Sequence, residues 1–228
     1  MNFNKTGLDF KDEIEKSLKE VLNINENNAI ANYNLALLYL DIDMDLAKYH
    51  FRKCIHNELT RERAQEMIEK IEAVENYDKA VELIKLENYQ EALKILIHLY
   101  ENNPDNLDVI YYIAVCYRNL GLNEKALMYL YELYSKLEVP EVNIEIGLNL
   151  ASLGYYQEAL RYFKDALKLK PNDSSIICNI GVCYLYLNET QKAKESFELA
   201  LKIDKDDKIA KSGLRKYRVT CKKAKNML

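Results

Sequence analysis

Residues 140–173 and 174–207 carry the same pattern of residues twice, 34 positions apart. The matching positions are Ile146 with Ile180, Gly147 with Gly181, Ala159 with Ala193, Phe163 with Phe197, and Ala166 with Ala200. A fixed period of this length is typical of stacked supersecondary units, each of which buries its apolar face against the next. The sequence therefore predicts a repeat array rather than a globule around one central core.

The units of this array are expected to be helical. The 228 residues include only three Pro and six Gly, which leaves little room for long loops. Apolar residues recur at steps of three and four, as in Ala210, Leu214, Tyr217 and Cys221. No run approaches the 18 apolar residues of a membrane-spanning helix. We therefore predict an all-α protein without a transmembrane segment.

Reading outward from 140–207 divides the whole chain, residues 1–228, into one expected solenoid of antiparallel helix pairs. Its segments are a partial repeat at 8–28, repeats at 29–59, 73–106, 107–139, 140–173 and 174–207, a helical extension at 60–72, and a basic capping helix at 208–228. Residues 60–86 contain neither Gly nor Pro. They are expected to form one long helix, or two helices with a small kink.

Small residues recur where the two helices of each pair must cross. They are Ala36, Ala80, Ala114, Gly147 and Gly181 in the first helices, and Ala47, Ala92, Ala126, Ala159 and Ala193 in the second. Larger side chains at these positions would overpack the crossing. Gly121 and Gly154 fall in the turn between the helices, where a positive φ is favourable for glycine.

Together these residues resemble the tetratricopeptide repeat family, whose unit is a 34-residue helix–turn–helix. The resemblance covers about residues 29–207 and departs from the family in three respects, one of which is that the 60–72 extension has no counterpart in the repeat. The large aromatic expected early in each first helix is replaced by Asn32, Asn76, Ile110, Asn143 and Ile177. The turn glycine is absent from the first two repeats and replaced by Asn188 in the last. The resemblance implies a right-handed superhelix whose first helices line a concave surface.

That surface is where the resemblance places a binding site for a peptide or helical segment of another protein. The groove residues it implies are Tyr33, Asn34, Tyr77, Tyr111, Tyr112, Val115, Arg118 and Asn179. Tyr111, Tyr112 and Arg118 are the strongest candidates because they share one repeat in the middle of the array. The alternative is that these tyrosines, or the N-terminal helix, fill the groove themselves.

Charge is distributed unevenly along the chain. The formal net charge is −4, which argues against bulk nucleic-acid binding, yet residues 208–228 hold eight basic residues and no acidic one. Lys222, Lys223 and Lys225 are therefore candidate contacts for an acidic partner, which keeps a regulatory or nucleic-acid-associated module as the alternative function. The simpler interpretation is that a capping helix needs a polar outer face.

Signs of catalysis or metal binding are absent from the sequence. Its three His, His50, His56 and His98, form no metal-ligating pair with acidic residues, and no phosphate-binding loop or nucleophile motif occurs. Five Cys without a C-x-x-C pair are typical of a reduced, cytoplasmic protein. The sequence thus predicts a cytoplasmic, non-enzymatic scaffold for protein–protein interaction that uses no cofactor.

Overall fold

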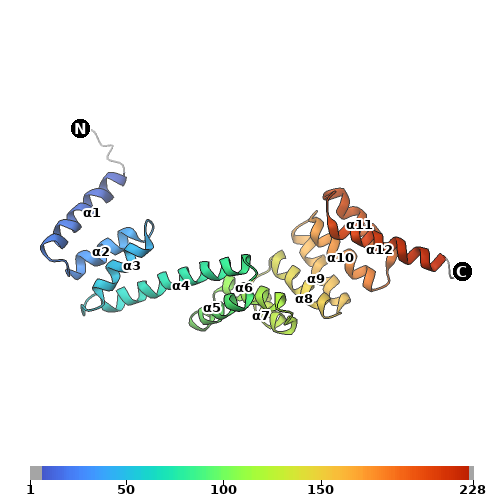
Figure 1. The fold of residues 1–228 in the computed structure, drawn as a ribbon, viewed down its shortest axis with the longest axis horizontal. Helices are drawn as coiled ribbons and strands as arrows, with labels where there is room; N and C mark the ends of the chain where they lie inside the picture. The colour runs from blue at the N-terminus through green and yellow to red at the C-terminus, as the bar shows by residue number, and fades with distance from the viewer. Residues whose placement is uncertain (1–6, 226–228) are drawn as a thin grey trace. The chain divides into compact units, whose positions relative to one another are not determined.

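The computed structural model describes the backbone of residues 7–225 and the side chains of residues 10–217, and within these limits its only regular secondary structure is α-helix. The helices are α1 (Gly7–Ile24), α2 (Ala29–Tyr39), α3 (Met44–Cys54), α4 (Arg61–Lys85), α5 (Tyr89–Asn102), α6 (Leu107–Asn119), α7 (Asn123–Lys136), α8 (Pro140–Ser152), α9 (Tyr156–Leu169), α10 (Ser174–Tyr186), α11 (Thr190–Ile203) and α12 (Lys208–Lys225), drawn in Figure 1. The predicted all-α solenoid of helix pairs is confirmed.

The chain divides into two compact units, residues 1–78 and residues 79–228. The division falls inside α4, which runs without a break from Arg61 to Lys85. Of the two alternatives for residues 60–86, the single long helix is the one observed. Each unit has its own core.

In the first unit, α2 and α3 form an antiparallel pair covered by α1 and by the first half of α4. The core contains Leu35, Ala36, Ala47, Phe51, Ala64 and Ile68, while Leu18 and Leu22 of α1 pack against it. The side chains of Asn28 and Asp43 cap the N-termini of α2 and α3. Asn28 Oδ1 accepts from the Ala31 amide, and Asp43 Oδ1 accepts from the Leu46 amide, so each satisfies a backbone donor at a helix N-terminus.

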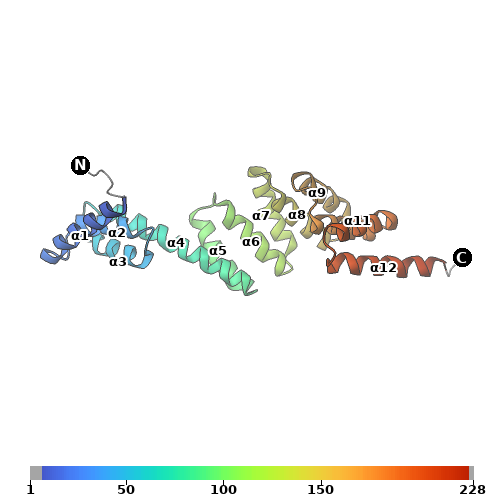
Figure 2. The ribbon, with the colours of Figure 1, turned by 90° about the horizontal axis from the view of Figure 1, so that it is seen from above.

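In the second unit, the pairs α6/α7, α8/α9 and α10/α11 follow one another, with α5 before them and α12 after them (Figures 1 and 2). One continuous core runs through α6 to α10 and includes Ile110, Leu130, Ile146, Phe163 and Ile180. A second cluster around Phe197 joins α10 and α11 to Ala210 of α12. Each helix pair thus buries its apolar residues against the next pair.

The turn between the helices of a pair has the same geometry four times. Glu87, Gly121, Gly154 and Asn188 all have positive φ, at 59°, 75°, 87° and 61°. In each turn the next amide donates back across the helix end, for example from Leu122 to the Tyr117 carbonyl and from Asn88 to the Leu83 carbonyl. This is the hydrogen bonding of a left-handed helix C-cap. The loop between α2 and α3 has four residues, 40–43, against three in each of those turns, and none of the four has a positive φ.

Close approach of helices at small residues is most pronounced around Phe197. A Cβ atom added to Gly181 of α10 would lie 2.8 Å from the Phe197 ring, and one added to Gly213 of α12 would lie 2.4 Å from it. Gly147 approaches Phe163 in the same way. The crossing role predicted for Gly147 and Gly181 is confirmed, and Gly213 fulfils the same role for α12.

Candidate partner-binding groove

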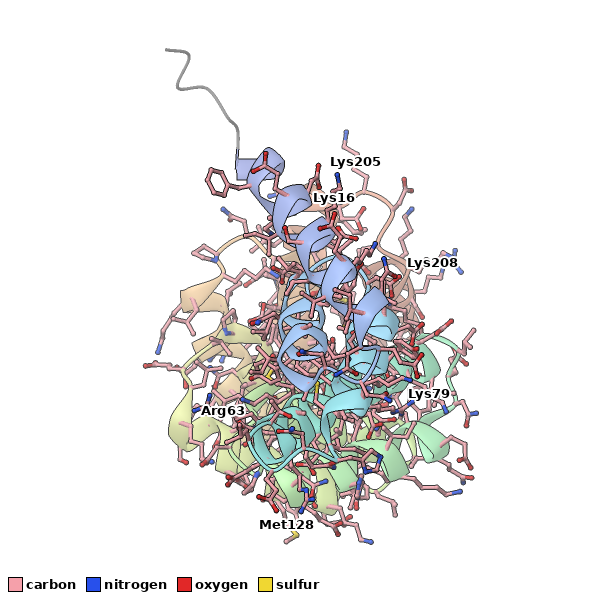
Figure 3. The ribbon with its side chains drawn as sticks, turned by 90° about the vertical axis from the view of Figure 1, so that its left-hand side faces the viewer. Lys16, Arg63, Lys79, Met128, Lys205 and Lys208 are labelled. Atoms are coloured by element: carbon pink, nitrogen blue, oxygen red, sulfur yellow. The ribbon has the colours of Figure 1, made fainter. Side chains whose placement is uncertain are left out.

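The first helices form the inner layer of the second unit. Contacts join α6 to α8 and α8 to α10, whereas the second helices of successive pairs approach one another less extensively. Helices that lie closer together occupy the inner side of a curved array. The outer side is marked by Met128 of α7, which is 72% exposed and projects away from the body (Figure 3).

On α6, the predicted groove residues Tyr111, Tyr112, Val115 and Arg118 are all half-buried. The rings of Tyr111 and Tyr112 meet edge to face with centroids 5.5 Å apart. Tyr111 also packs against the core between α6 and α8. Burial, together with the nearby carboxylates of Glu145 and Glu141, raises the pKa of Tyr111 to about 12. Its hydroxyl therefore stays protonated and able to donate a hydrogen bond throughout the neutral range.

Arg118 is engaged with another helix. Its Nε donates to Glu145 Oε2 at 2.7 Å and its Nη2 donates to Glu145 Oε1 at 3.4 Å, which ties α6 to α8. The side chains are only 27% and 9% exposed, respectively. An arginine fork on a carboxylate fixes both groups in orientation. This pair makes Arg118 a contact between α6 and α8, a role that sequence spacing does not reveal because the partners are 27 residues apart.

The remaining predicted groove residues are distributed over both units. Asn179 is half-buried on α10, at the repeat position that Tyr112 occupies on α6 and Glu145 on α8. In the first unit, Tyr33 is half-buried edge to face against Phe51 at 5.5 Å, and Asn34 is exposed beside it on α2. Tyr77 is half-buried on α4. The structure therefore brings together the α6 residues with Glu145, while Tyr33, Asn34 and Tyr77 belong to the other unit.

The basic terminal helix is described only in part. Lys208, Lys211, Arg215 and Lys216 are exposed on α12, whereas Ala210 and Gly213 are buried toward α11 and α10. The side chains of Lys222, Lys223 and Lys225, the predicted contacts for an acidic partner, lie outside the described residues.

The cysteines have the environment of packing residues. Cys54, Cys116, Cys178 and Cys183 are free thiols, and all four are buried. Burial raises their pKa values to about 11 for Cys54, Cys116 and Cys183 and about 12 for Cys178. A nucleophilic cysteine needs the opposite shift, toward the thiolate. Among the described residues no group of three His, Cys, Asp or Glu side chains could hold a metal ion.

Two buried amides distinguish α8 from the other first helices. Asn143 replaces the early aromatic of the repeat and is buried, as is Asn149 two turns later. Their Nδ2 groups donate to the Val139 and Glu145 carbonyls, but both Oδ1 atoms are enclosed without a partner in the described part of the chain. Each unsatisfied acceptor costs free energy of folding. We find no structural compensation for them.

Models of the tetratricopeptide repeat match three stretches, residues 77–136, 140–173 and 174–207, which together make up more than half of the chain. The chain belongs to the tetratricopeptide repeat family. Its repeats have the architecture of a protein-interaction scaffold. None of the described helices combines the length and the apolar character required to cross a membrane.

The relatives that are similar in sequence match only part of the chain. BBSome complex member BBS4 of Xenopus tropicalis is 35% identical over 63 residues, which is 28% of this chain and 12% of BBS4. The protein ycf37 of Guillardia theta is 32% identical over 104 residues, which is 46% of this chain and 58% of ycf37. The chain therefore spans 12% of BBS4 and 58% of ycf37, which is less than two thirds of either relative.

Solved structures support the fold over a longer stretch. YrrB superimposes with a TM-score of 0.55 at 22% identity, covering 88% of this chain and 99% of YrrB. TTC0263 of Thermus thermophilus superimposes with a TM-score of 0.57 at 23% identity, covering 65% of this chain and 82% of TTC0263. At this level of identity the similarity is one of fold.

Proposed function

We propose that the protein is a non-enzymatic scaffold of the cytoplasm that holds a peptide or helical segment of another protein against the inner face of α6, α8 and α10. The observation that carries this proposal is the half-buried row of apolar and tyrosine side chains on these first helices. It comprises Tyr111, Tyr112 and Val115 on α6, Ile144 and Leu148 on α8, and Val182 on α10. Each side chain keeps part of its surface open to a partner.

The chemistry of this face suits an amphipathic segment. Apolar side chains of the partner would remove Val115, Leu148 and the tyrosine rings from water, which is the main driving force of such binding. The Tyr111 and Tyr112 hydroxyls would hydrogen-bond to the partner's backbone. The charges of Arg118 and Glu145 neutralise each other within the wall, so they impose no strong preference for a charged partner. YrrB, which shares the fold, is described as having an unusual peptide-binding site.

The proposal is tested by isolating partners on the immobilised protein, reducing the best one to a binding peptide, and measuring its affinity for variants. Tyr112→Ala should weaken binding at least about tenfold, because tyrosines at the centre of an interface contribute strongly to affinity. Met128→Ala, on the outer face of α7, is the matched control and should bind like the wild type. Unchanged binding by Tyr112→Ala together with Val115→Ser would rule out this face.

A second candidate function rests on the exposed basic residues of α12. Between residues 208 and 228 no acidic side chain offsets the eight basic ones, so this helix would attract an acidic partner. Reversal of Lys222, Lys223 and Lys225 to Glu should then weaken binding, and added salt should weaken it as well. A partner whose affinity responds to neither change does not use this helix.

A further inference from the structure

The first unit contains a pocket of about 500 Å³, whereas the proposed partner-binding face lies on α6, α8 and α10 of the second unit. It is bordered by the end of α1 (Leu22, Asn23 and Ile24), by Glu26 in the following loop, by Asn32 of α2, and by Tyr49, His50 and Lys53 of α3. Apolar and polar side chains both contribute to its wall. A pocket of this size accommodates a small molecule or one side chain of a partner.

The back of the pocket holds a histidine whose proton position is fixed by its neighbour. Both hydrogens of Asn32 Nδ2 are donated to backbone carbonyls, to Glu26 at 2.9 Å and to Asn28 at 3.0 Å. Asn32 Oδ1 is therefore left as an acceptor, and His50 Nδ1 lies 2.8 Å from it. His50 Nδ1 must consequently carry the proton, and Nε2 presents a lone pair.

This Nε2 atom is available to a ligand. His50 is only 9% exposed, yet among the described residues Nε2 has no hydrogen-bond partner. The only described side-chain nitrogen or oxygen atoms that are both enclosed and unpartnered are Asn143 Oδ1 and Asn149 Oδ1, so Nε2 reaches the solvent of the pocket. Tyr39, stacked at 5.7 Å, and Tyr49, edge-on at 5.1 Å, hold the ring in place.

The charged groups around the ring favour its neutral form. Burial lowers the pKa of His50, and the positive charges of Lys19 on α1 and Lys53 on α3 lower it further. Glu15 is held by Lys19 and by the Tyr39 hydroxyl, and Glu26 lies 4.0 Å from Lys53 at the rim. The pocket thus offers a hydrogen-bond acceptor at its back and an ammonium group at its side.

We propose that this pocket binds a primary carboxamide, either a free small molecule or the side chain of an Asn or Gln residue. The carboxamide N–H donates to His50 Nε2, its carbonyl accepts from Lys53 Nζ, and its carbon chain lies against Leu22, Ile24 and Tyr49. A carboxamide carries both the donor and the acceptor that these two contacts need, and it carries no formal charge. A carboxylate lacks the donor for Nε2, and an alkylammonium lacks the acceptor for Lys53 Nζ.

Three probes of nearly equal size separate these possibilities: propionamide, propionate and n-propylamine. They are titrated at pH 7.5 into the 228-residue chain labelled for NMR, with the His50 ring and the Ile24 methyl groups as reporters. Propionamide should give saturable shifts with a Kd on the order of millimolar, in keeping with the few atoms of the probe. Propionate and n-propylamine should bind at least about tenfold more weakly. Equal affinity for either charged probe, or no saturable shift with propionamide, overturns the proposal.

Variants assign the binding to the pocket. His50→Asn keeps an N–H near Asn32 but removes Nε2, and the Ile24 reporter should lose its response. Ile24→Trp obstructs the pocket from a residue that is 90% exposed, so it should abolish the His50 response without affecting folding. His98→Asn, which alters an exposed histidine of α5, is the control and should bind normally. Retention of binding by His50→Asn or Ile24→Trp also overturns the proposal, which is independent of the groove.

Discussion

The Arg118 guanidinium and the Glu145 carboxylate tie the first helices of two successive repeats together through a bidentate, largely enclosed ion pair. Because both charges lie between α6 and α8, the pair belongs to the interface between repeats as much as to the groove. A charge left alone at such a site is costly to the folded state. The stability of the second unit should therefore depend on both partners.

Arg118→Ala should lower the free energy of unfolding by roughly 2–4 kcal/mol, because it leaves Glu145 buried without its partner. Urea unfolding followed by circular dichroism measures the change. Lys168→Ala, which removes an exposed ion pair with Asp165 within α9, should leave stability nearly unchanged. Arg118→Met combined with Glu145→Leu should recover most of the loss. If Arg118→Ala and Lys168→Ala lowered the free energy of unfolding by similar amounts, Arg118 would have no special role in stability.

Gly213→Ala should destabilise the packing of α12 by about 1–3 kcal/mol, because the new methyl group would overlap the Phe197 ring. If the overlap is the cause, a smaller side chain at position 197 should relieve it. In a double-mutant cycle, the loss in Gly213→Ala with Phe197→Leu should be less than the sum of the two single losses. Additive losses would point to a cause other than this contact.

Glu87→Gly should stabilise the protein by about 0.5–1 kcal/mol, because a residue with a Cβ is strained at positive φ and glycine is not. The control is Glu82→Gly in the preceding helix α4, where φ is helical and glycine should cost about 1 kcal/mol. Thermal and urea unfolding should show changes in the free energy of unfolding of opposite sign for the two variants. Destabilisation by both would mean that the Glu87 side chain stabilises the turn.

The first unit should lose stability as pH falls below about 6.5, the ordinary pKa of histidine. Burial and the charges of Lys19 and Lys53 lower the pKa of His50 in the folded state, so the unfolded chain takes up its proton first. The stability that neutral His50 contributes is fully present above pH 6.5, and it is lost as the pH falls through the pKa of His50 in the folded state. Between pH 7.5 and 5, the melting temperature should decline less in His50→Asn than in the wild type.

Thiol reactivity should be low in the native protein. At pH 8, pKa values of about 11 to 12 reduce the thiolate fraction of Cys54, Cys116, Cys178 and Cys183 on the order of 100-fold or more. In a Cys221→Ser variant, reaction with a disulfide reagent should therefore be slow until the protein is unfolded in urea. Rapid labelling of the folded variant would show that one of these thiols is exposed by local opening.

The sequence predicts the architecture well because the repeat encodes it locally. Helix pairs, crossing residues such as Ala159 and Gly181, and the turn at Gly154 all follow from spacing along one chain segment. Those features need no knowledge of distant residues. That the pairs build one right-handed superhelix through both units stays a prediction.

The candidate sites were less predictable because their contacts join residues far apart in sequence. Arg118 is assigned to the groove by its repeat position, but its partner on α8 is known only from the fold. Asn32 is seen in the sequence only as the replacement of an aromatic. Its role as the anchor of His50 depends on carbonyls of a loop and on a ring 18 residues away.

The four turns at residues 87, 121, 154 and 188 are spaced by 34, 33 and 34 residues. All four have a positive φ, although the residue type at this position is not the same in every repeat. Glutamate, glycine and asparagine all adopt one conformation there, imposed by the helices on either side. The residue type at this turn can therefore change without altering the spacing of the helix pairs. Counting repeats by backbone geometry therefore recovers units that residue patterns alone understate.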